Sequence, residues 1–385
     1  MTAVHRQTEI AAGFLPLLDA APLIVARAKG FALAEGLELR LLREQSWAAV
    51  RDRISIGHID AAHMPAPLPI ATTLGLGSLA VELEAPLALA RGGNAITVSQ
   101  TLWDLMKEAG APMGAGDPMA CGRALKLALD QRKQTGAQRP VFGVVHPFSS
   151  HNYELRHWLF VAGIVTDDDV QIVVLPPPYM ADALAAGRID GYCAGEPWNS
   201  LAQQSGAGRI VTTKARLWPG LIEKVLATRG EALTPDVTAR LINALAQAAD
   251  WCDKPENREE LAHLLAQPDH MNLPAKALTP GLSGELTLGD ANPTLELEFL
   301  RFGGPASAPD RTQALWLYAQ MVRWGQTSFN AQDAARAMSL YRTDLWSAAR
   351  GEAAHISQNI TSFDGVTFDA ADIEAWLTRS AVTVA

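Results

Sequence analysis

Short apolar runs alternate with amphipathic helical patterns over the first part of the chain. Residues 8–14 and 37–42 have the apolar character of buried strands. Between them, residues 20–29 predict a helix, with Asp19 as its N-cap and Gly30 as its terminator. Strands that alternate with helices are typical of βαβ units, so the pattern predicts an α/β fold with a mostly parallel sheet.

A short segment of the chain occurs twice. In residues 53–64 and again in 183–194, a helix end is followed by Gly, two residues, Asp and a short strand of small residues. Junctions of this kind occur in many α/β proteins, so the spacing alone leaves a coincidence open. The second interpretation is that the chain forms two similar α/β lobes.

The predicted lobes are discontinuous in sequence. Lobe I is expected to comprise residues 1–95 and 196–385, and lobe II residues 96–195. Such an arrangement places strand ends and helix N-termini around a ligand cleft. The last third of the chain predicts a helical C-terminal extension of lobe I. Its helical patterns cover residues 255–266, 311–324 and 331–350, with a long loop over 278–309.

Composition and charge narrow the function classes. The 385 residues are 48% hydrophobic and 19% charged, which is typical of a globular protein. A formal net charge of -9 argues against direct binding of nucleic acid, but it leaves a small anionic ligand open. The three cysteines are scattered, which favours a reducing compartment over a disulfide framework. We find no signal peptide and no membrane span, so we expect a cytoplasmic protein without membrane contact.

Motifs for catalysis are missing from the sequence. The Gly-rich stretches lack the later glycine or lysine of a phosphate-binding loop, and neither Gly-x-Ser-x-Gly nor His-Glu-x-x-His occurs. The nine histidines do not show the spacing of three or four converging metal ligands. We therefore expect no enzyme activity, no cofactor and no metal.

Three residues with anion-binding chemistry lie in or next to predicted helices and strands. Trp47 begins a helix over 47–56 capped by Ser46, and it either fills the core or offers an apolar wall with one N–H donor. His151 precedes a helical pattern, where it either donates to an anion or caps the helix at the surface. Lys224 lies in an apolar strand, as a snorkelling surface lysine or as the positive charge that a buried monoanion requires.

Six ordered phrases of the sequence resemble one family, the nitrate- and bicarbonate-binding proteins of ABC transporters (NrtA/CmpA-like). The phrases are GFLPLLDAAPLIV (13–25), SWAAVRD (46–52), IDAAHM (59–64), VLPPP (174–178), GEPWN (195–199) and QMVRWG (320–325). The resemblance implies a type II periplasmic-binding-protein fold, whose two α/β lobes close over an oxyanion. By motif, it assigns the ligand wall to Trp47, Asn94, His151, Pro177 and Lys224.

Two of these positions bear on the ligand. Asn94 stands where the family usually has Gln, so its shorter amide departs from the pattern. At the position of Lys224, nitrate binders resemble this chain, whereas bicarbonate binders carry an acidic residue and recruit a metal. The resemblance therefore implies nitrate or nitrite as the ligand.

Because we expect a cytoplasmic protein, the chain resembles one branch of this family in particular, the cytoplasmic NasS-type nitrate/nitrite sensors. Such a sensor holds an RNA-binding antiterminator with an ANTAR domain and releases it when the ligand binds. One alternative is the nitrate-binding component of an ABC transporter. A further alternative is an enzyme on the same fold, for which Cys193 is the only cysteine expected near the cleft.

Overall fold

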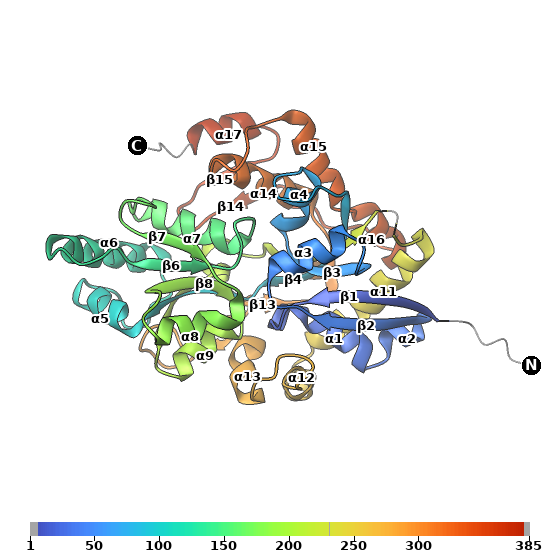
Figure 1. Cartoon of the computed structure of the whole chain (residues 1–385), viewed down its shortest axis with the longest axis horizontal. Helices are drawn as coiled ribbons and strands as arrows, with labels where there is room; N and C mark the ends of the chain where they lie inside the picture. Colours follow the sequence, from blue (N-terminus) through green and yellow to red (C-terminus); the bar gives the residue numbers. More distant parts are fainter. Residues whose placement is uncertain (1–6, 231, 381–385) are drawn as a thin grey trace, which may run out of the picture.

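Two β-sheets form the centres of two lobes in the computed structural model, which describes residues 7–230 and 232–380 (Figure 1). The sheet of lobe I contains, in spatial order, β13 (Leu300–Arg301), β4 (Leu83–Gly92), β10 (Ile222–Arg229), β3 (Ala61–Pro65), β1 (Thr8–Phe14) and β2 (Leu37–Arg43). The sheet of lobe II contains β7 (Gln171–Val174), β6 (Val141–Val144), β8 (Gly191–Gly195), β5 (Asn94–Ser99) and β9 (Gly208–Thr213). The fold class is α/β as predicted, but the prediction of a mostly parallel sheet is wrong: in both sheets at least half of the strand pairs are antiparallel.

The two sheets repeat one design. In lobe I the order β2-β1-β3-β10-β4 matches β7-β6-β8-β5-β9 of lobe II, with the antiparallel partner in the same place. The carboxylate of Asp60 accepts a hydrogen bond from the backbone N–H of Ala11 at 2.9 Å, and Asp190 accepts one from Val141 at 2.9 Å. The recurring Asp therefore ties the start of β3 to β1 in lobe I and the start of β8 to β6 in lobe II, which explains the repeated segment.

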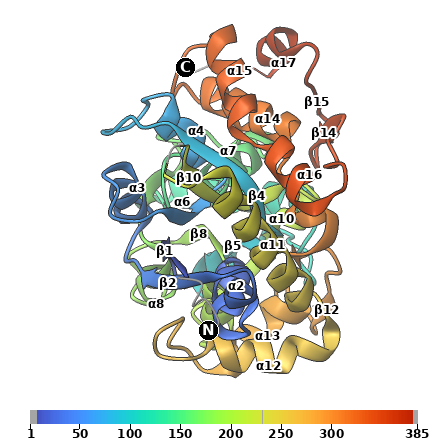
Figure 2. The ribbon, with the colours of Figure 1, turned by 90° about the vertical axis from the view of Figure 1, so that its right-hand side faces the viewer.

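Helices cover both faces of each sheet (Figures 1 and 2). Lobe I contains α1 (Ala21–Ala28), α2 (Phe31–Ala34), α3 (Trp47–Ser55), α4 (Pro67–Thr73), α11 (Pro235–Cys252), α12 (Arg258–Leu265) and α13 (Ala275–Ser283). Lobe II contains α5 (Gln100–Glu108), α6 (Pro118–Gln134), α7 (Ser150–Val161), α8 (Met180–Ala185), α9 (Trp198–Gln204) and α10 (Lys214–Leu217). The C-terminal extension contains α14 (Arg311–Arg323), α15 (Ala331–Leu340), α16 (Thr343–Arg350), the hairpin β14 (Asn359–Thr361) and β15 (Thr367–Asp369), and α17 (Ile373–Arg379). The short pair β11 (Glu285–Leu286) and β12 (Thr294–Leu295) follows α13 in the sequence and packs against it.

Three local predictions differ from the structure. The chain returns to lobe I only after β9 and α10, later than the predicted boundary after residue 195, because β9 pairs with β5. Asp19 does not cap α1, since its carboxylate forms buried ion pairs instead. The helix expected over 331–350 is interrupted at Tyr341, whose side chain is buried and donates to the carbonyl of Ala66 at 3.0 Å.

The C-terminal extension touches both lobes. α14 packs against α4, and α16 packs against α11, both in lobe I. Toward lobe II, the Tyr153 hydroxyl on α7 donates to the Gln326 side chain at 2.7 Å. None of the helices in the described part of the chain has the length and apolar composition needed to cross a membrane.

Candidate functional site

The predicted site residues lie where the edges of the two sheets meet. In lobe I, β3 ends at Pro65, and this residue is the antiparallel partner of Lys224 near the start of β10. In lobe II, β8 ends at Gly195, which is the partner of Asn94 at the start of β5. Ligands of open α/β sheets bind outside the carboxyl ends of the parallel strands. We call this meeting place the lobe junction.

Lys224 is fully buried in the lobe junction. Its Nζ atom lies 2.8 Å from Asp19 Oδ2 and 2.8 Å from Glu223 Oε1. Burial alone lowers the pKa of this lysine, but the two carboxylates outweigh it and raise the pKa above its usual value. Lys224 is therefore a buried cation, and the alternative of a snorkelling surface lysine is wrong.

Trp47 stands beside this cation on lobe I. Its helix α3 begins as predicted, with Ser46 Oγ accepting from the backbone N–H of Ala49 at 3.2 Å. The Lys224 Nζ atom lies 5.6 Å from the centre of the Trp47 ring, and the ring of His63 meets the indole edge to face at 5.1 Å. Within the described residues, the indole N–H of Trp47 is buried without a hydrogen-bond partner.

His151 is the corresponding group on lobe II. It occupies the second position of α7, and Ser149 rather than His151 caps that helix, its hydroxyl accepting from the N–H of Asn152 at 3.2 Å. The ring is fully buried, with Nε2 at 3.5 Å from Glu223 Oε1. Burial lowers the pKa of His151 to about 3, so the ring is neutral near pH 7 and carries one N–H donor. The alternative of a surface capping histidine is wrong.

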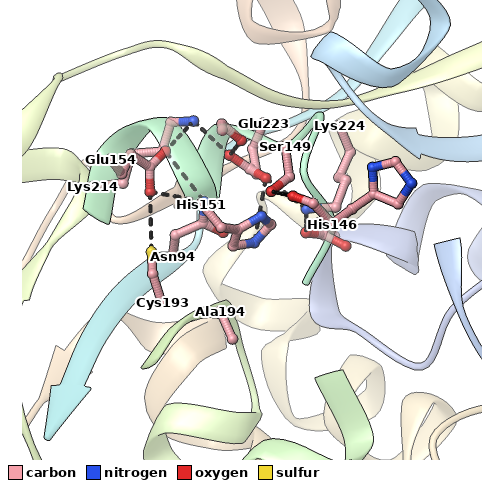
Figure 3. Close-up of polar contacts among 12 residues, drawn as sticks. Asn94, His146, Ser149, His151, Glu154, Cys193, Ala194, Lys214, Glu223 and Lys224 are labelled. Atoms are coloured by element: carbon pink, nitrogen blue, oxygen red, sulfur yellow. Dashed lines mark hydrogen bonds and ion pairs between the residues drawn. The ribbon is translucent and has the colours of Figure 1, made fainter. Parts of the chain in front are cut away.

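Two further charged groups, Glu154 on α7 and Lys214 on α10, extend the cluster into lobe II (Figure 3). Lys214 Nζ lies 2.9 Å from Glu154 Oε1 and 2.5 Å from Glu223 Oε2. All three side chains are at most 1% exposed. Because Glu223 also meets Lys224, a continuous row of alternating charges crosses from one lobe to the other.

The carboxyl groups in this row have different electrostatic environments. Burial raises the pKa of Glu223, but Lys214 and Lys224 together outweigh it and hold that pKa well below the usual range. Burial also acts on Glu154, where Lys214 compensates only in part, so the pKa of Glu154 is raised. Glu154 is thus the carboxyl of the row that most readily accepts a proton.

Asn94 and Pro177 complete the predicted set. The Asn94 amide is fully buried, and its Nδ2 donates to Glu154 at 3.1 Å and 3.3 Å. Its Oδ1 lies 3.4 Å from the point that a Cβ on Gly195 would occupy. Pro177 is buried in the short 3-10 helix η2 (Pro177–Tyr179), which follows β7 at the same sheet edge. The structure brings Trp47, Asn94, His151 and Lys224 into one cluster, and no side-chain hydrogen bond or ion pair among the described residues joins Pro177 to it.

Unpartnered polar atoms gather at the lobe junction. Among residues 7–230 and 232–380, the buried side-chain atoms without a hydrogen bond at this place include Trp47 Nε1, His63 Nδ1, Asn94 Oδ1, His151 Nδ1 and His151 Nε2. Leaving one such group unsatisfied costs about 1 to 3 kcal/mol. Several of them around one cation indicate a site for a small polar ligand. In the same part of the chain, no group of three or more His, Cys, Asp or Glu side chains is arranged to hold a metal ion.

Sequence reasoning missed most of the charged partners. The sequence predicts Asp19 as a helix cap and gives no sign of Glu223 or Lys214 as site residues, because residue type does not tell a buried ion pair from a surface one. A signal for Glu154 was available: it lies three residues after His151, on the same face of a helix.

The known proteins that are similar to this chain are named for binding and transport. The model of the NMT1-like family matches residues 4–266. The chain is 35% identical over 382 residues to the nitrate import ATP-binding protein NrtC of Synechocystis sp., covering 95% of this chain and 54% of that protein. It is 31% identical over 388 residues to the nitrate/nitrite binding protein NrtA of Synechococcus elongatus, covering 95% of this chain and 84% of that one.

A solved structure extends the likeness to three dimensions. The crystal structure of the periplasmic nitrate-binding protein NrtA from Synechocystis superposes with a TM-score of 0.89 at 25% identity, over 98% of this chain and 99% of that one. This match confirms the predicted periplasmic-binding-protein-like fold. The chain spans about half the length of NrtC and of the bicarbonate transport ATP-binding protein CmpC. NrtA and CmpA, in contrast, are named as nitrate/nitrite- and bicarbonate-binding proteins, which agrees with the prediction that the chain is not an enzyme.

Proposed function

Because this chain belongs to the NMT1-like family, with the nitrate- and bicarbonate-binding proteins NrtA and CmpA among its relatives, we propose that it binds nitrate or nitrite at the lobe junction. The observation that carries the proposal is the group of unpartnered polar atoms around the buried Lys224 cation. A ligand with several acceptor oxygens would satisfy the donors in that group, which otherwise destabilise the folded state.

The donors suit a planar monoanion. An ammonium group has three N–H donors, and the contacts of Lys224 with Asp19 and Glu223 leave one for a ligand. The Trp47 indole adds one N–H from lobe I, and the neutral His151 ring adds one from lobe II. The three oxygens of nitrate offer acceptors for all three groups. Contacts from both lobes to one ligand would couple binding to lobe closure.

Lys224 favours nitrate or nitrite over bicarbonate. The resemblance associates bicarbonate with an acidic residue at this position and with a metal, whereas this chain has a lysine there. Lysine at this position supplies the positive charge that an acidic residue could supply only through a bound metal. The names of the relatives include both ligands, so this choice depends on the residue and not on overall similarity.

Two roles follow from nitrate binding, and transport has the stronger support. The relatives are named as import, transport and binding proteins, which favours a solute-binding component of an ABC-type transporter. The finer hypothesis is a cytoplasmic sensor that releases an ANTAR-domain antiterminator when nitrate or nitrite binds. The net charge of -9 is compatible with it, since only the partner would touch RNA. Co-elution of the two purified proteins that nitrate abolishes would favour the sensor.

Calorimetric titration of the purified chain with nitrate, nitrite, bicarbonate and chloride tests the ligand assignment. We expect saturable binding of nitrate or nitrite and none of chloride. Bicarbonate should not bind, with or without calcium. Binding of bicarbonate alone would replace nitrate as the ligand, and binding of none of these anions would overturn the proposal.

A further inference from the structure

The charges buried at the lobe junction do not balance. The row contains three carboxylates, Asp19, Glu154 and Glu223, against two ammonium groups, Lys214 and Lys224. Each of the five side chains is at most 3% exposed. With every group in its usual charge state, the row carries one excess negative charge. A monoanion added here would increase that excess in a medium that stabilises charge poorly.

The Asn94 amide adds to this difficulty. Its Nδ2 donates to both oxygens of Glu154, so its carbonyl oxygen is the free end of the group. That oxygen and Asp19 Oδ2 lie 3.4 Å and 3.5 Å from the point that a Cβ on Gly195 would fill. Two acceptors therefore border the same small volume, and acceptors repel the oxygens of an anion.

A single proton on Glu154 removes both obstacles. A protonated carboxyl is a hydrogen-bond donor, and Asn94 Oδ1 is the neighbouring atom able to accept from it after the amide turns over. The turned amide would present its N–H groups to the ligand in place of its oxygen. The row of charges would become neutral before the anion adds its own charge.

We propose that Glu154 determines the specificity of the site, by requiring that a monoanion binds together with one proton held between Glu154 and Asn94. This inference rests on the proposed function. Glu154 acts through Asn94 on the ligand and is therefore a positioning residue.

The surroundings of Glu154 favour it as the proton acceptor. It is faced by Lys214 from α10, Glu223 from β10 and the Cys193 thiol from β8, whose Sγ lies 3.5 Å from Glu154 Oε2. On its own helix, His151 lies one turn before it. Burial raises the pKa of Glu154, and the neighbouring Glu223 raises it further against the opposing effect of Lys214. By contrast, the pKa of Glu223 is lowered and that of His151 is about 3, so neither readily takes up the proton.

The test is nitrate titration calorimetry between about pH 6 and 9, in pairs of buffers with different protonation enthalpies. Above the pKa of Glu154 in the free protein, the affinity of the wild-type chain should fall by roughly tenfold per pH unit. Proton uptake should approach one per nitrate. In Glu154→Gln the side chain is neutral at every pH and can donate to Asn94 Oδ1. This variant should bind nitrate without proton uptake and with an affinity that does not change with pH.

Glu196→Gln is the matched control. Glu196 is also buried, and burial raises its pKa to about 7, but its carboxylate accepts from the backbone N–H of Ser200 at 3.1 Å and has no described contact with Asn94. This variant should keep the proton uptake of the wild type. Retained uptake in Glu154→Gln, or its loss in Glu196→Gln alone, would overturn the inference.

A measurement on the wild-type chain covers the case in which Glu154→Gln does not fold. Infrared difference spectra with isotope-labelled glutamate should show the band of a protonated carboxyl when nitrate is added at about pH 8. Nitrate binding without this band and without proton uptake would overturn the inference and leave the proposed function intact. Absence of nitrate and nitrite binding at every pH would overturn both.

Discussion

Helix α7 carries two buried polar clusters that differ in one respect. Near its start, His151 and Glu154 face the lobe junction, where ring nitrogens and an amide oxygen are unpartnered among the described residues. Near its end, His157 has partners at both ring nitrogens: Arg323 lies 3.0 Å from Nδ1, and Ser362 lies 3.3 Å from Nε2. Burial and charge are common to both clusters. The unpartnered ring nitrogens of His151, against the partnered ones of His157, distinguish a ligand group from a structural contact.

The second cluster joins lobe II to the C-terminal extension. The His157 ring stacks on Trp218 at 4.8 Å, and the Arg323 guanidinium lies over the rings of Trp324, Phe160 and Trp376. Arg323 also donates to the carbonyl of Ser380 at 3.1 Å. The His157 ring and the Arg323 guanidinium have protein partners, so these two groups require no ligand and brace lobe II against the C-terminal extension. Trp376 Nε1 is the buried donor of this cluster without a partner in the described residues.

Removal of the central cation is expected to have the largest effect. In Lys224→Met, the buried carboxylates of Asp19 and Glu223 lose a partner, and breaking a buried ion pair in this way costs about 3 to 5 kcal/mol. Urea unfolding should show this loss, and calorimetry should show no nitrate binding. The control is Lys126→Met, which removes a partly exposed pair with Asp130 within α6 and should cost about 1 kcal/mol or less. A Lys224→Met protein as stable as the wild type would contradict the described ion pairs.

The histidines of α7 offer the most direct test of the comparison. His157→Leu should lower the free energy of unfolding by about 1 to 3 kcal/mol, because Arg323 and Ser362 lose a buried partner, while nitrate affinity stays the same. His151→Leu should lower the nitrate affinity and leave the free energy of unfolding nearly unchanged. The His151 ring nitrogens are unpartnered in the described structure, so only the ligand loses a donor. Urea unfolding gives the free energy of unfolding of each variant, and titration calorimetry gives its nitrate affinity. Loss of nitrate affinity in His157→Leu would show that the brace takes part in binding.

The sequence predicted the framework of the fold because that framework depends on local patterns. The strand at 8–14 and the Ser46-capped helix at Trp47 occur where expected, and the recurring Asp60 and Asp190 make the same bond in each lobe. The boundary after 195 failed because a strand after β8 and α9 still pairs within lobe II, and pairing partners cannot be read from a local pattern.

The charged part of the site was beyond sequence reasoning for a different reason. Asp19 and Lys224 are far apart in the chain and meet only because η1 (Leu18–Ala20) and β10 reach the same sheet edge. Four of the five predicted wall residues cluster there, but the resemblance supplied their positions without the ion pairs that surround them. Long-range pairing of charges decides whether a lysine in an apolar strand is a ligand group or a surface group.

The smallest expected effect concerns a single hydrogen bond. Trp47→Phe keeps most of the ring beside Lys224 and removes the indole N–H, which has no partner in the described residues. Nitrate affinity should therefore fall by about 1 kcal/mol with little loss of stability, as measured by calorimetry and urea unfolding. Trp103→Phe is the matched control in lobe II, because its N–H donates to Asp290 at 2.9 Å. That variant should lose stability and keep its nitrate affinity. If Trp47→Phe instead lost only stability, the indole N–H would belong to the packing of lobe I and not to the ligand.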